Sequence, residues 1–160
     1  MKRGIYPGTF DPITNGHLDL VFRGLRIFDE MIVAVAVNPK KQPLFSIEER
    51  LELIREAVAG HQNVIVESFD GLLVEYTRNK GGIAIIRGLR AVSDFEYELQ
   101  MALMNRKLDM SVETVFMMPS EEHSFITSTI VKEAASFGGS VNGLVPEAVE
   151  GALRKKFGRG

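Results

Sequence analysis

The sequence predicts the α/β class: a single domain in which a five-stranded parallel sheet carries helices on both faces. Two observations lead to this class. Five short runs rich in Ile and Val lack the apolar–polar alternation of half-exposed strands, as expected for parallel strands covered on both sides. Between these runs lie stretches whose apolar residues recur with a helical period, so strands and helices alternate along the chain.

The predicted elements follow from this pattern in chain order. The predicted strands are residues 3–6, 31–37, 63–68, 83–87 and 113–118. The predicted helices are residues 17–28, 50–59, 71–79, 94–108, 126–137 and 146–157. Ser46 with Glu49, and Ser93 with Glu96, have the spacing of capping boxes that open the second and fourth helices. Pro146 suits the first turn of the last helix.

The composition limits the classes of function. The chain has 160 residues, which fits one domain, and no cysteine, which excludes disulfides and thiolate metal sites and agrees with a reducing cytoplasm. The first residues lack the apolar core of a signal peptide, and the longest apolar run, 31–37, is too short to cross a bilayer. A formal net charge of −2 provides no basic field for a nucleic acid. We therefore expect neither a nucleic-acid nor a membrane partner.

The carboxyl ends of the strands are the expected site, because open parallel sheets bind ligands there. The stretch YPGTFDPITNGH follows the first strand and holds Thr9 and His17 in a loop dense in glycine and proline. Thr14 is expected to cap the next helix, which places His17 at the positive end of a helix dipole, where anions bind. This position favours a neutral imidazole. The alternative is an ordinary turn with a surface histidine.

Two further loops carry cations. Lys41 follows the second strand between two prolines, and taken alone it would be an ordinary solvated lysine. Arg87 ends the fourth strand and Arg90 follows it after a glycine turn, and together they can hold a phosphate through paired N–H groups. The alternative for these arginines is an ion-pair network with Glu96 or Glu98.

The loop after the fifth strand brings three hydroxyls to the start of a helix. Thr127, Ser128 and Thr129 would make a second anion site there, although ordinary capping needs only one of them. Gathered at one edge of one sheet, the cations and hydroxyls imply a highly anionic ligand such as a nucleoside triphosphate. The sequence has no G-x-x-x-x-G-K-[ST] loop, no G-x-G-x-x-G turn, no Ser–His–Asp pattern and no cluster with metal-ligand spacing.

Three blocks of the chain resemble a known family. GTFDPITNGH (8–17) resembles the T-x-G-H signature of the nucleotidyltransferase superfamily, and ITSTIVKE (126–133) resembles its second signature. IRGLRAVSDFEYE (86–98) narrows the resemblance to the bacterial phosphopantetheine adenylyltransferases. The resemblance implies one Rossmann-like nucleotidyltransferase domain over residues 1–160. It also implies a step of coenzyme A biosynthesis, in which ATP and 4′-phosphopantetheine give dephospho-coenzyme A and pyrophosphate.

The resemblance also implies roles for matching positions. His17 would be the catalytic transition-state stabiliser, with Lys41 and Arg90 supplying positive charge. The phosphopantetheine-binding residues that it implies are Thr9, Lys41, Leu73 and Arg87. The ATP-binding residues that it implies are Thr9, Phe10, His17, Gly88, Leu89, Arg90, Glu98, His123, Ser124, Phe125, Ile126, Thr127, Ser128 and Thr129. The family further implies Mg²⁺, with no protein side chain assigned as its ligand, a homohexamer and feedback by coenzyme A.

The chemistry of these substrates indicates direct transfer. The acceptor is a phosphate that is already anionic at neutral pH, so no general base is needed, and no serine or cysteine is placed as a covalent nucleophile. We expect in-line attack on the α-phosphorus, catalysed by positioning and electrostatic stabilisation. Two alternatives stay open: a sister nucleotidyltransferase with another phosphorylated acceptor, and a non-catalytic nucleotide-binding regulatory module. The apolar residues crowding residues 95–108 predict either a buried helix or a subunit interface.

Overall fold

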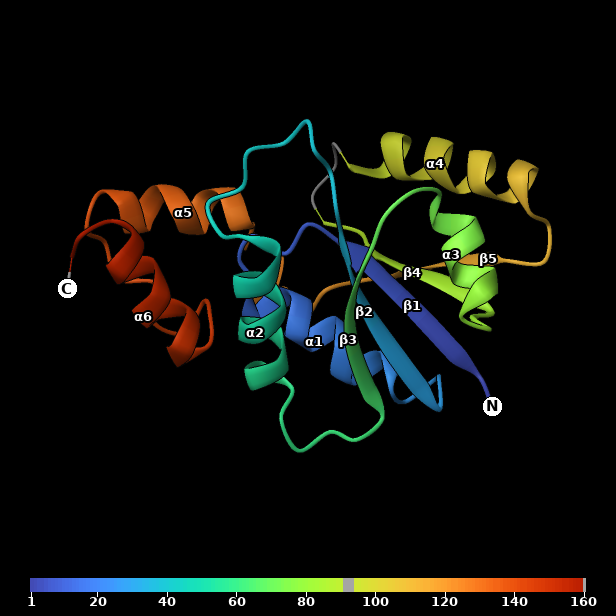
Figure 1. Ribbon diagram of the computed structural model, residues 1–160, viewed down its shortest axis with the longest axis horizontal. Helices are drawn as coiled ribbons and strands as arrows, with labels where there is room; N and C mark the ends of the chain where they lie inside the picture. The colour runs from blue at the N-terminus through green and yellow to red at the C-terminus, as the bar shows by residue number, and fades with distance from the viewer. Residues whose placement is uncertain (91–93, 160) are drawn as a thin grey trace.

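The structure is a computed structural model of the chain, and it describes residues 1–90 and 94–159. Its strands form one parallel sheet with the order β3–β2–β1–β4–β5 (Figure 1). The strands are β1 (Arg3–Gly8), β2 (Glu30–Ala36), β3 (Val64–Phe69), β4 (Ala84–Gly88) and β5 (Glu113–Met117). Every predicted strand is confirmed, with ends that differ from the prediction by one or two residues.

Six α-helices connect and follow these strands. They are α1 (Asn15–Gly24), α2 (Ile47–Ala57), α3 (Leu73–Asn79), α4 (Asp94–Leu108), α5 (Ser128–Ser136) and α6 (Glu147–Lys156). A short 3-10 helix, η1 (Glu121–His123), precedes α5 and was not predicted. All six predicted helices are present, so the α/β class with a five-stranded parallel sheet is confirmed.

The helix ends show where local signals held and where packing overrode them. Ser46 opens α2 with the predicted capping box, whereas the predicted box at Ser93 lies outside the described residues. The predicted helix 17–28 is wrong at its end, because α1 stops at Gly24 and the following turns bury Phe28 in the core. Pro146 occupies the cap position immediately before α6, one residue earlier than predicted.

Both faces of the sheet are covered, as predicted. One face, with the side chains of Tyr6, Val33 and Ile86, forms the larger core together with residues of α1, α2, α5 and α6. The opposite face, with Ile5 and Ile32, packs against α3, and α4 lies beside α3 on that side (Figure 1). Because alternate residues of each strand enter different cores, the strands read as continuous apolar runs.

The strand order places a switch point at β1. From β1 the chain builds β2 and β3 on one side, and it then crosses to β4 and β5 on the other. The carboxyl ends of β1 and β4, at Gly8 and Gly88, therefore lie side by side with their connections leading in opposite directions. Such a divergence leaves a crevice beyond the strand ends, where open α/β sheets bind ligands.

The surface of α4 corrects one of the two predictions for that helix. Its apolar side chains are not buried within the chain, because Tyr97 is 62% and Leu103 is 57% exposed. The predicted buried helix is therefore wrong.

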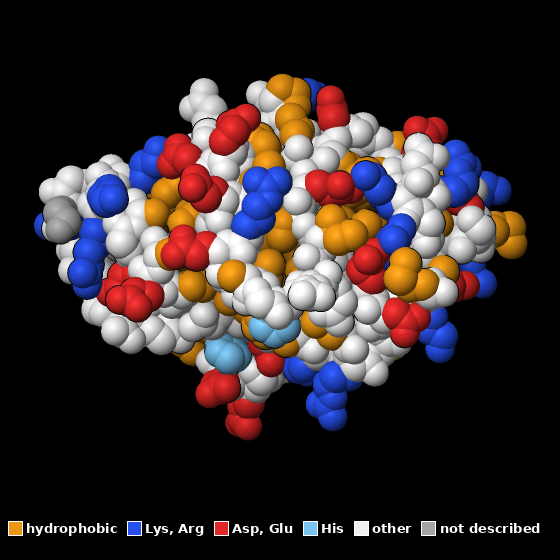
Figure 2. Space-filling view, turned by 60° about the horizontal axis from the view of Figure 1, so that its bottom comes forward, with side chains coloured by type: hydrophobic (Ala, Val, Ile, Leu, Met, Phe, Trp, Pro, Cys, Tyr) orange, Lys and Arg blue, Asp and Glu red, His pale blue; other side chains and the backbone are white. Residues whose placement is uncertain are grey.

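Acidic and basic side chains are interspersed on the face of the molecule shown in Figure 2. In the part of the chain that is described, no helix combines the length and the apolar character needed to cross a membrane.

Candidate active site

A cavity of about 680 Å³ lies at the carboxyl ends of β1 and β4. Its walls come from the end of β1, the start of α1, the loop after β2, the end of β4, α4, η1 and the start of α5. The predicted site residues that line it are Thr9, Phe10, His17, Lys41, Arg87, Gly88, Arg90, Glu98, His123, Ile126, Thr127, Ser128 and Thr129. Residues far apart in the sequence are thus brought to one place, as the strand-end argument predicted.

Four predicted site residues do not line this cavity: Leu73, Leu89, Ser124 and Phe125. Leu73 begins α3 and packs against the apolar clusters of the opposite sheet face. Phe125 is 57% exposed beside the cavity. Their assignments to the ligands stay predictions.

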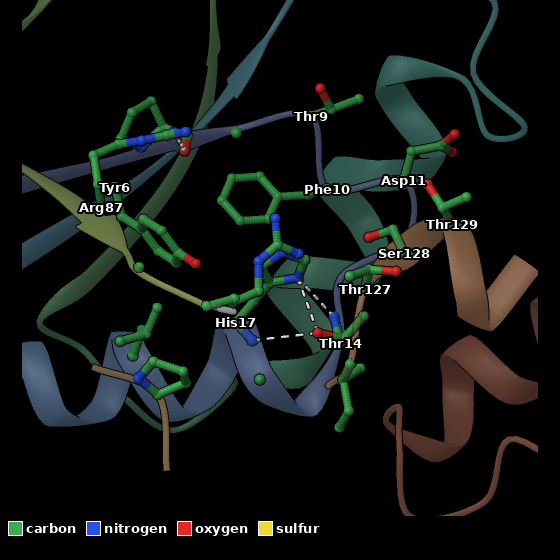
Figure 3. A pocket seen from close by; sticks show the side chains of 18 of the residues that line it. Tyr6, Thr9, Phe10, Asp11, Thr14, His17, Arg87, Thr127, Ser128 and Thr129 are labelled. Carbon is green, nitrogen blue, oxygen red and sulfur yellow. Dashed lines mark hydrogen bonds between the residues drawn. The ribbon is translucent and has the colours of Figure 1, made fainter. Parts of the chain in front are cut away.

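Thr14 and His17 form the first turn of α1 as a reciprocal cap (Figure 3). The His17 backbone N–H donates to Thr14 Oγ1 (3.3 Å), and the Thr14 backbone N–H donates to His17 Nδ1 (3.0 Å). The predicted N-cap is therefore confirmed, and the imidazole takes the place of the Glu or Gln that usually closes such a box. Because Nδ1 accepts this bond, the neutral ring carries its proton on Nε2.

The environment of His17 keeps the ring uncharged. Desolvation by burial, with smaller contributions from the positive charges of Arg90 and Arg87, lowers the pKa of His17 to about 3. The predicted neutral imidazole is confirmed, but the sequence argument credited the helix end, whereas burial is the largest cause. At neutral pH the ring is a hydrogen-bond donor through Nε2 and not a source of a proton.

Aromatic packing fixes the plane of the His17 ring. Phe10 meets it edge-on, with centroids 5.0 Å apart, and Tyr6 packs edge-on against Phe10 at 5.3 Å (Figure 3). Phe10 reaches this position with a backbone φ of 49°, a left-handed conformation that costs energy in a residue with a side chain. A Cβ at Gly8 would lie 2.9 Å from the Phe10 ring, so the glycine is required for close packing. Sequence reasoning did not single out Tyr6.

Arg87 and Glu98 form a two-pronged ion pair. Arg87 Nε donates to Glu98 Oε2 (2.8 Å) and Arg87 Nη2 donates to Glu98 Oε1 (2.6 Å). Arg87 Nη1 also donates to the carbonyl of Pro7 (3.2 Å). The hydrogen bonds that Arg87 donates to Glu98 raise the pKa of Arg87, against the effect of burial. The arginine–glutamate network, given as the alternative for this arginine, is therefore present.

Lys41 reaches the cavity from the loop after β2. Its Nζ donates to Thr9 Oγ1 at 3.4 Å, so the lysine and the first loop meet at the cavity wall. The bond is long and the lysine is exposed, as expected for a cation available to a ligand. Lys41 from the loop after β2 and His17 from the first turn of α1 line the same cavity.

The three hydroxyls at the start of α5 have different uses. Thr127 Oγ1 accepts the Ile130 backbone N–H (3.1 Å), which is ordinary capping, and Ser128 Oγ donates to the Pro12 carbonyl (2.8 Å). Thr129 also lines the cavity, and among the described residues its hydroxyl has no hydrogen-bond partner. In Figure 3 all three lie across the cavity from Tyr6. The predicted second anion site is thus partly occupied by structural bonds.

Two charged residues to which the sequence assigned no role also line the cavity, Asp11 and Lys132. The Asp11 carboxylate accepts hydrogen bonds from the backbone N–H groups of Leu44 (2.8 Å) and Phe45 (2.9 Å), and from Lys132 Nζ (3.0 Å). It thereby joins the first loop, the loop before α2, and α5. The signal in the sequence was the presence of Asp11 inside the first motif and Lys132 inside the last.

Comparisons with known proteins identify the family. A family model described as cytidylyltransferase-like matches residues 5–134. The phosphopantetheine adenylyltransferase of Thermodesulfovibrio yellowstonii is 60% identical over 98% of this chain and 98% of its own length. That of Alkaliphilus oremlandii is 57% identical over 98% of this chain and 100% of its own length, and that of Moorella thermoacetica is 54% identical over 99% of each. The chain belongs to the phosphopantetheine adenylyltransferase family.

The resemblance read from three short blocks is therefore confirmed over almost the whole chain. In this phosphopantetheine adenylyltransferase family member, the cavity lining includes Lys41, Arg87, Arg90 and Lys132 against the carboxylates of Asp11 and Glu98. With His17 uncharged, the lining has a net positive charge. A lining of this charge, next to the neutral His17 ring, suits phosphate-bearing ligands.

Proposed function

We propose that this family member transfers the adenylyl group of ATP to 4′-phosphopantetheine, giving dephospho-coenzyme A and pyrophosphate. One observation carries the proposal: a single cationic cavity at the switch point contains both the neutral His17 and Arg87. Both substrates are anions, and they must meet in one space for the acceptor phosphate to reach the α-phosphorus. The names of the close relatives support the same activity.

The transfer is a direct in-line displacement. An oxygen of the acceptor phosphate attacks the α-phosphorus of ATP, and the bond to the bridging oxygen of pyrophosphate breaks. His17 Nε2–H donates to a phosphoryl oxygen on which negative charge grows, and it keeps its proton throughout. Lys41 and Arg90 offset the repulsion between the two substrates. Catalysis is then positioning together with electrostatic stabilisation.

Arg87 serves as the anchor for phosphopantetheine. A guanidinium has five N–H donors, and the described residues use three of them, two on Glu98 and one on the Pro7 carbonyl. Two donors are left for a phosphate, so the ion pair and phosphate binding are compatible. Glu98 holds the planar group in place, which keeps the remaining donors aimed in one direction.

We propose that ATP is used as its Mg²⁺ complex. The carboxylates that line the cavity are engaged, Asp11 with Lys132 and Glu98 with Arg87, and the described residues contain no group of three His, Cys, Asp or Glu suited to a metal ion. The phosphate oxygens and water would therefore supply most of the ligands, as is usual for magnesium with nucleotides. The ion supplies neutralisation of the triphosphate charge.

The exposed apolar side chains of α4 support a homohexamer as the working form. Seven of them are at least 40% exposed in the isolated chain: Phe95, Tyr97, Leu99, Met101, Leu103, Met104 and Leu108. A monomer that exposes such a patch is uncommon, so we propose that other copies cover it. Sedimentation at micromolar concentration should show a single hexameric species, and a monomer would refute this proposal. Leu103→Glu should shift the population toward smaller species.

Coenzyme A is proposed as a feedback ligand. It carries the same pantetheine and adenosine diphosphate groups as the product, so it would compete for the same cavity. Inhibition by coenzyme A that is relieved by ATP and phosphopantetheine would support this. A cytoplasmic location is proposed as well, because the cysteine-free composition fits a reducing compartment.

The test of the activity is a pyrophosphate-release assay with a panel of acceptors. We expect turnover with ATP and 4′-phosphopantetheine, and little with nicotinate mononucleotide or glycerol phosphate. Turnover with another phosphorylated acceptor alone would indicate a sister nucleotidyltransferase. ATP binding without turnover on any acceptor would indicate a regulatory module. Mass spectrometry of the product distinguishes dephospho-coenzyme A from an adenylylated protein.

A further inference from the structure

Arg50 is a buried cation in contact with the first loop of the site. It lies in the first turns of α2, is only 4% exposed and does not line the cavity. Its guanidinium donates to three backbone carbonyls, those of Phe45 (3.1 Å), Ser46 (3.3 Å) and Thr9 (2.8 Å). The first two belong to the chain leading into its own helix. The third lies at the cavity wall.

Arg50 and Asp11 hold the same short segment from opposite sides. The Phe45 backbone N–H donates to Asp11 Oδ1, whereas the Phe45 carbonyl accepts from Arg50 Nε. Asp11 is itself part of the first loop, and Arg50 binds that loop at the Thr9 carbonyl. The two charged residues therefore clamp the loop before α2 to the loop after β1.

This clamp joins two walls of the cavity. Lys41 belongs to the loop that runs into Phe45, and it meets Thr9 through its Nζ. On the other side, Thr9 is followed directly by Phe10, whose ring packs on His17. Phe10 has the left-handed φ of 49°, a conformation that persists only where the surroundings impose it. The bond from Arg50 to the Thr9 carbonyl holds the peptide that precedes Phe10.

Removing the guanidinium would leave the carbonyls of Phe45, Ser46 and Thr9 without this donor, so a loss of stability is the competing explanation for any defect. The contacts of Arg50 are directional, and one of them joins the start of α2 to the segment that carries Thr9. We propose that Arg50 is a positioning residue for adenylyl transfer, which sets the spacing between Lys41 and His17 through the Thr9 carbonyl. This inference rests on the proposed function, because it concerns the same site.

Arg50→Met is the primary test, because methionine fills much of the space without a donor or a charge. The kinetic constants are measured by pyrophosphate release, with phosphopantetheine or with whichever acceptor of the panel the wild type uses. We expect kcat to fall about 10²-fold, as for other small misplacements of reacting groups, while the KM for ATP changes little. Arg55→Met is the matched control: Arg55 is an exposed residue of the same helix, and its substitution should leave kcat unchanged.

Two further measurements separate positioning from loss of folding. Thermal unfolding should show that Arg50→Met is folded at the assay temperature. If it is not, Arg50→Lys is used, which keeps the positive charge but lacks the planar guanidinium with its several N–H donors. Added guanidinium ion at low concentration should partly restore the kcat of Arg50→Ala and leave the Arg55→Met control unaffected. A folded Arg50→Met or Arg50→Lys protein with wild-type kcat would overturn the proposal. A wild type without turnover on any acceptor would instead refute the proposed function.

Discussion

Replacing His17 by alanine is expected to lower kcat about 10²–10³-fold and to change ATP affinity little. The neutral ring has one N–H donor, on Nε2, because Nδ1 already accepts the Thr14 backbone N–H. The substitution therefore removes one preorganised donor from the cavity in which we propose that the phosphates react. Loss of one such donor corresponds to about 2.7–4 kcal/mol of transition-state stabilisation, which gives the expected change in kcat.

The substitution also opens the cap of α1, so a second variant is needed. Without the imidazole the Thr14 N–H loses its partner, which costs about 1–3 kcal/mol of stability if the group stays buried. Glutamine is a usual residue at this position of a capping box. His17→Gln should therefore melt near the wild-type temperature and still show most of the loss in kcat.

The assay is steady-state pyrophosphate release with both substrates saturating, together with calorimetric titration of ATP into each variant. A loss confined to kcat, shared by His17→Ala and His17→Gln, is the expected result. If both variants turn over at the wild-type rate and bind ATP more weakly, His17 contributes ground-state binding and the role assigned to it is wrong.

Three other outcomes follow from the geometry. Arg87→Ala should raise the KM for phosphopantetheine, and it should lower the melting temperature by leaving Glu98 unpaired. The double variant that also carries Glu98→Gln should recover the melting temperature but not the KM. An unchanged KM would contradict the role of Arg87 as the anchor for phosphopantetheine. Because the folded pKa of His17 is about 3, below its unfolded value of about 6.5, its contribution to stability is complete above pH 6.5 and is lost as the pH falls toward 3. Urea denaturation of His17→Gln should show a shallower decline over that range, by at most about 1.4 kcal/mol per pH unit, and parallel curves would refute the linkage. Gly88→Ala would place a Cβ 2.5 Å from Leu20 Cδ1, so it should cost about 1–3 kcal/mol of stability, and an unshifted melting temperature would show that Leu20 relaxes freely.

The fold was predictable because local and global signals agree. Each strand is a short run rich in apolar residues, and caps such as Thr14 and Ser46 mark the starts of helices. The strand order was not available from these signals, since every order of five buried runs has the same apolar pattern. Phe28 shows where the prediction of helix ends failed. The helical spacing of apolar residues continues to Phe28, but the chain turns before this residue and buries it in the core.

The candidate site was predictable where a residue type sits at a strand end. His17, Lys41 and Arg87 were found in this way, and they line one cavity. Arg50 was not, although α2 offers a signal: it lies on the helix face of Ile54, so a charged residue occupies a buried position. Only the tertiary contact with the Thr9 carbonyl gives that burial a meaning, and a contact between residues 41 positions apart leaves no local trace.

The same atoms of His17 that close the first turn of α1 determine which ring nitrogen bears hydrogen. Formation of that turn therefore also sets the hydrogen on Nε2, the atom that we propose donates to the substrates. If His17 has the proposed role, brief fraying of this turn in the native state would leave the arginines in place but would slow adenylyl transfer until the helix start reformed. Amide exchange at Thr14 would then report the fraction of molecules able to react.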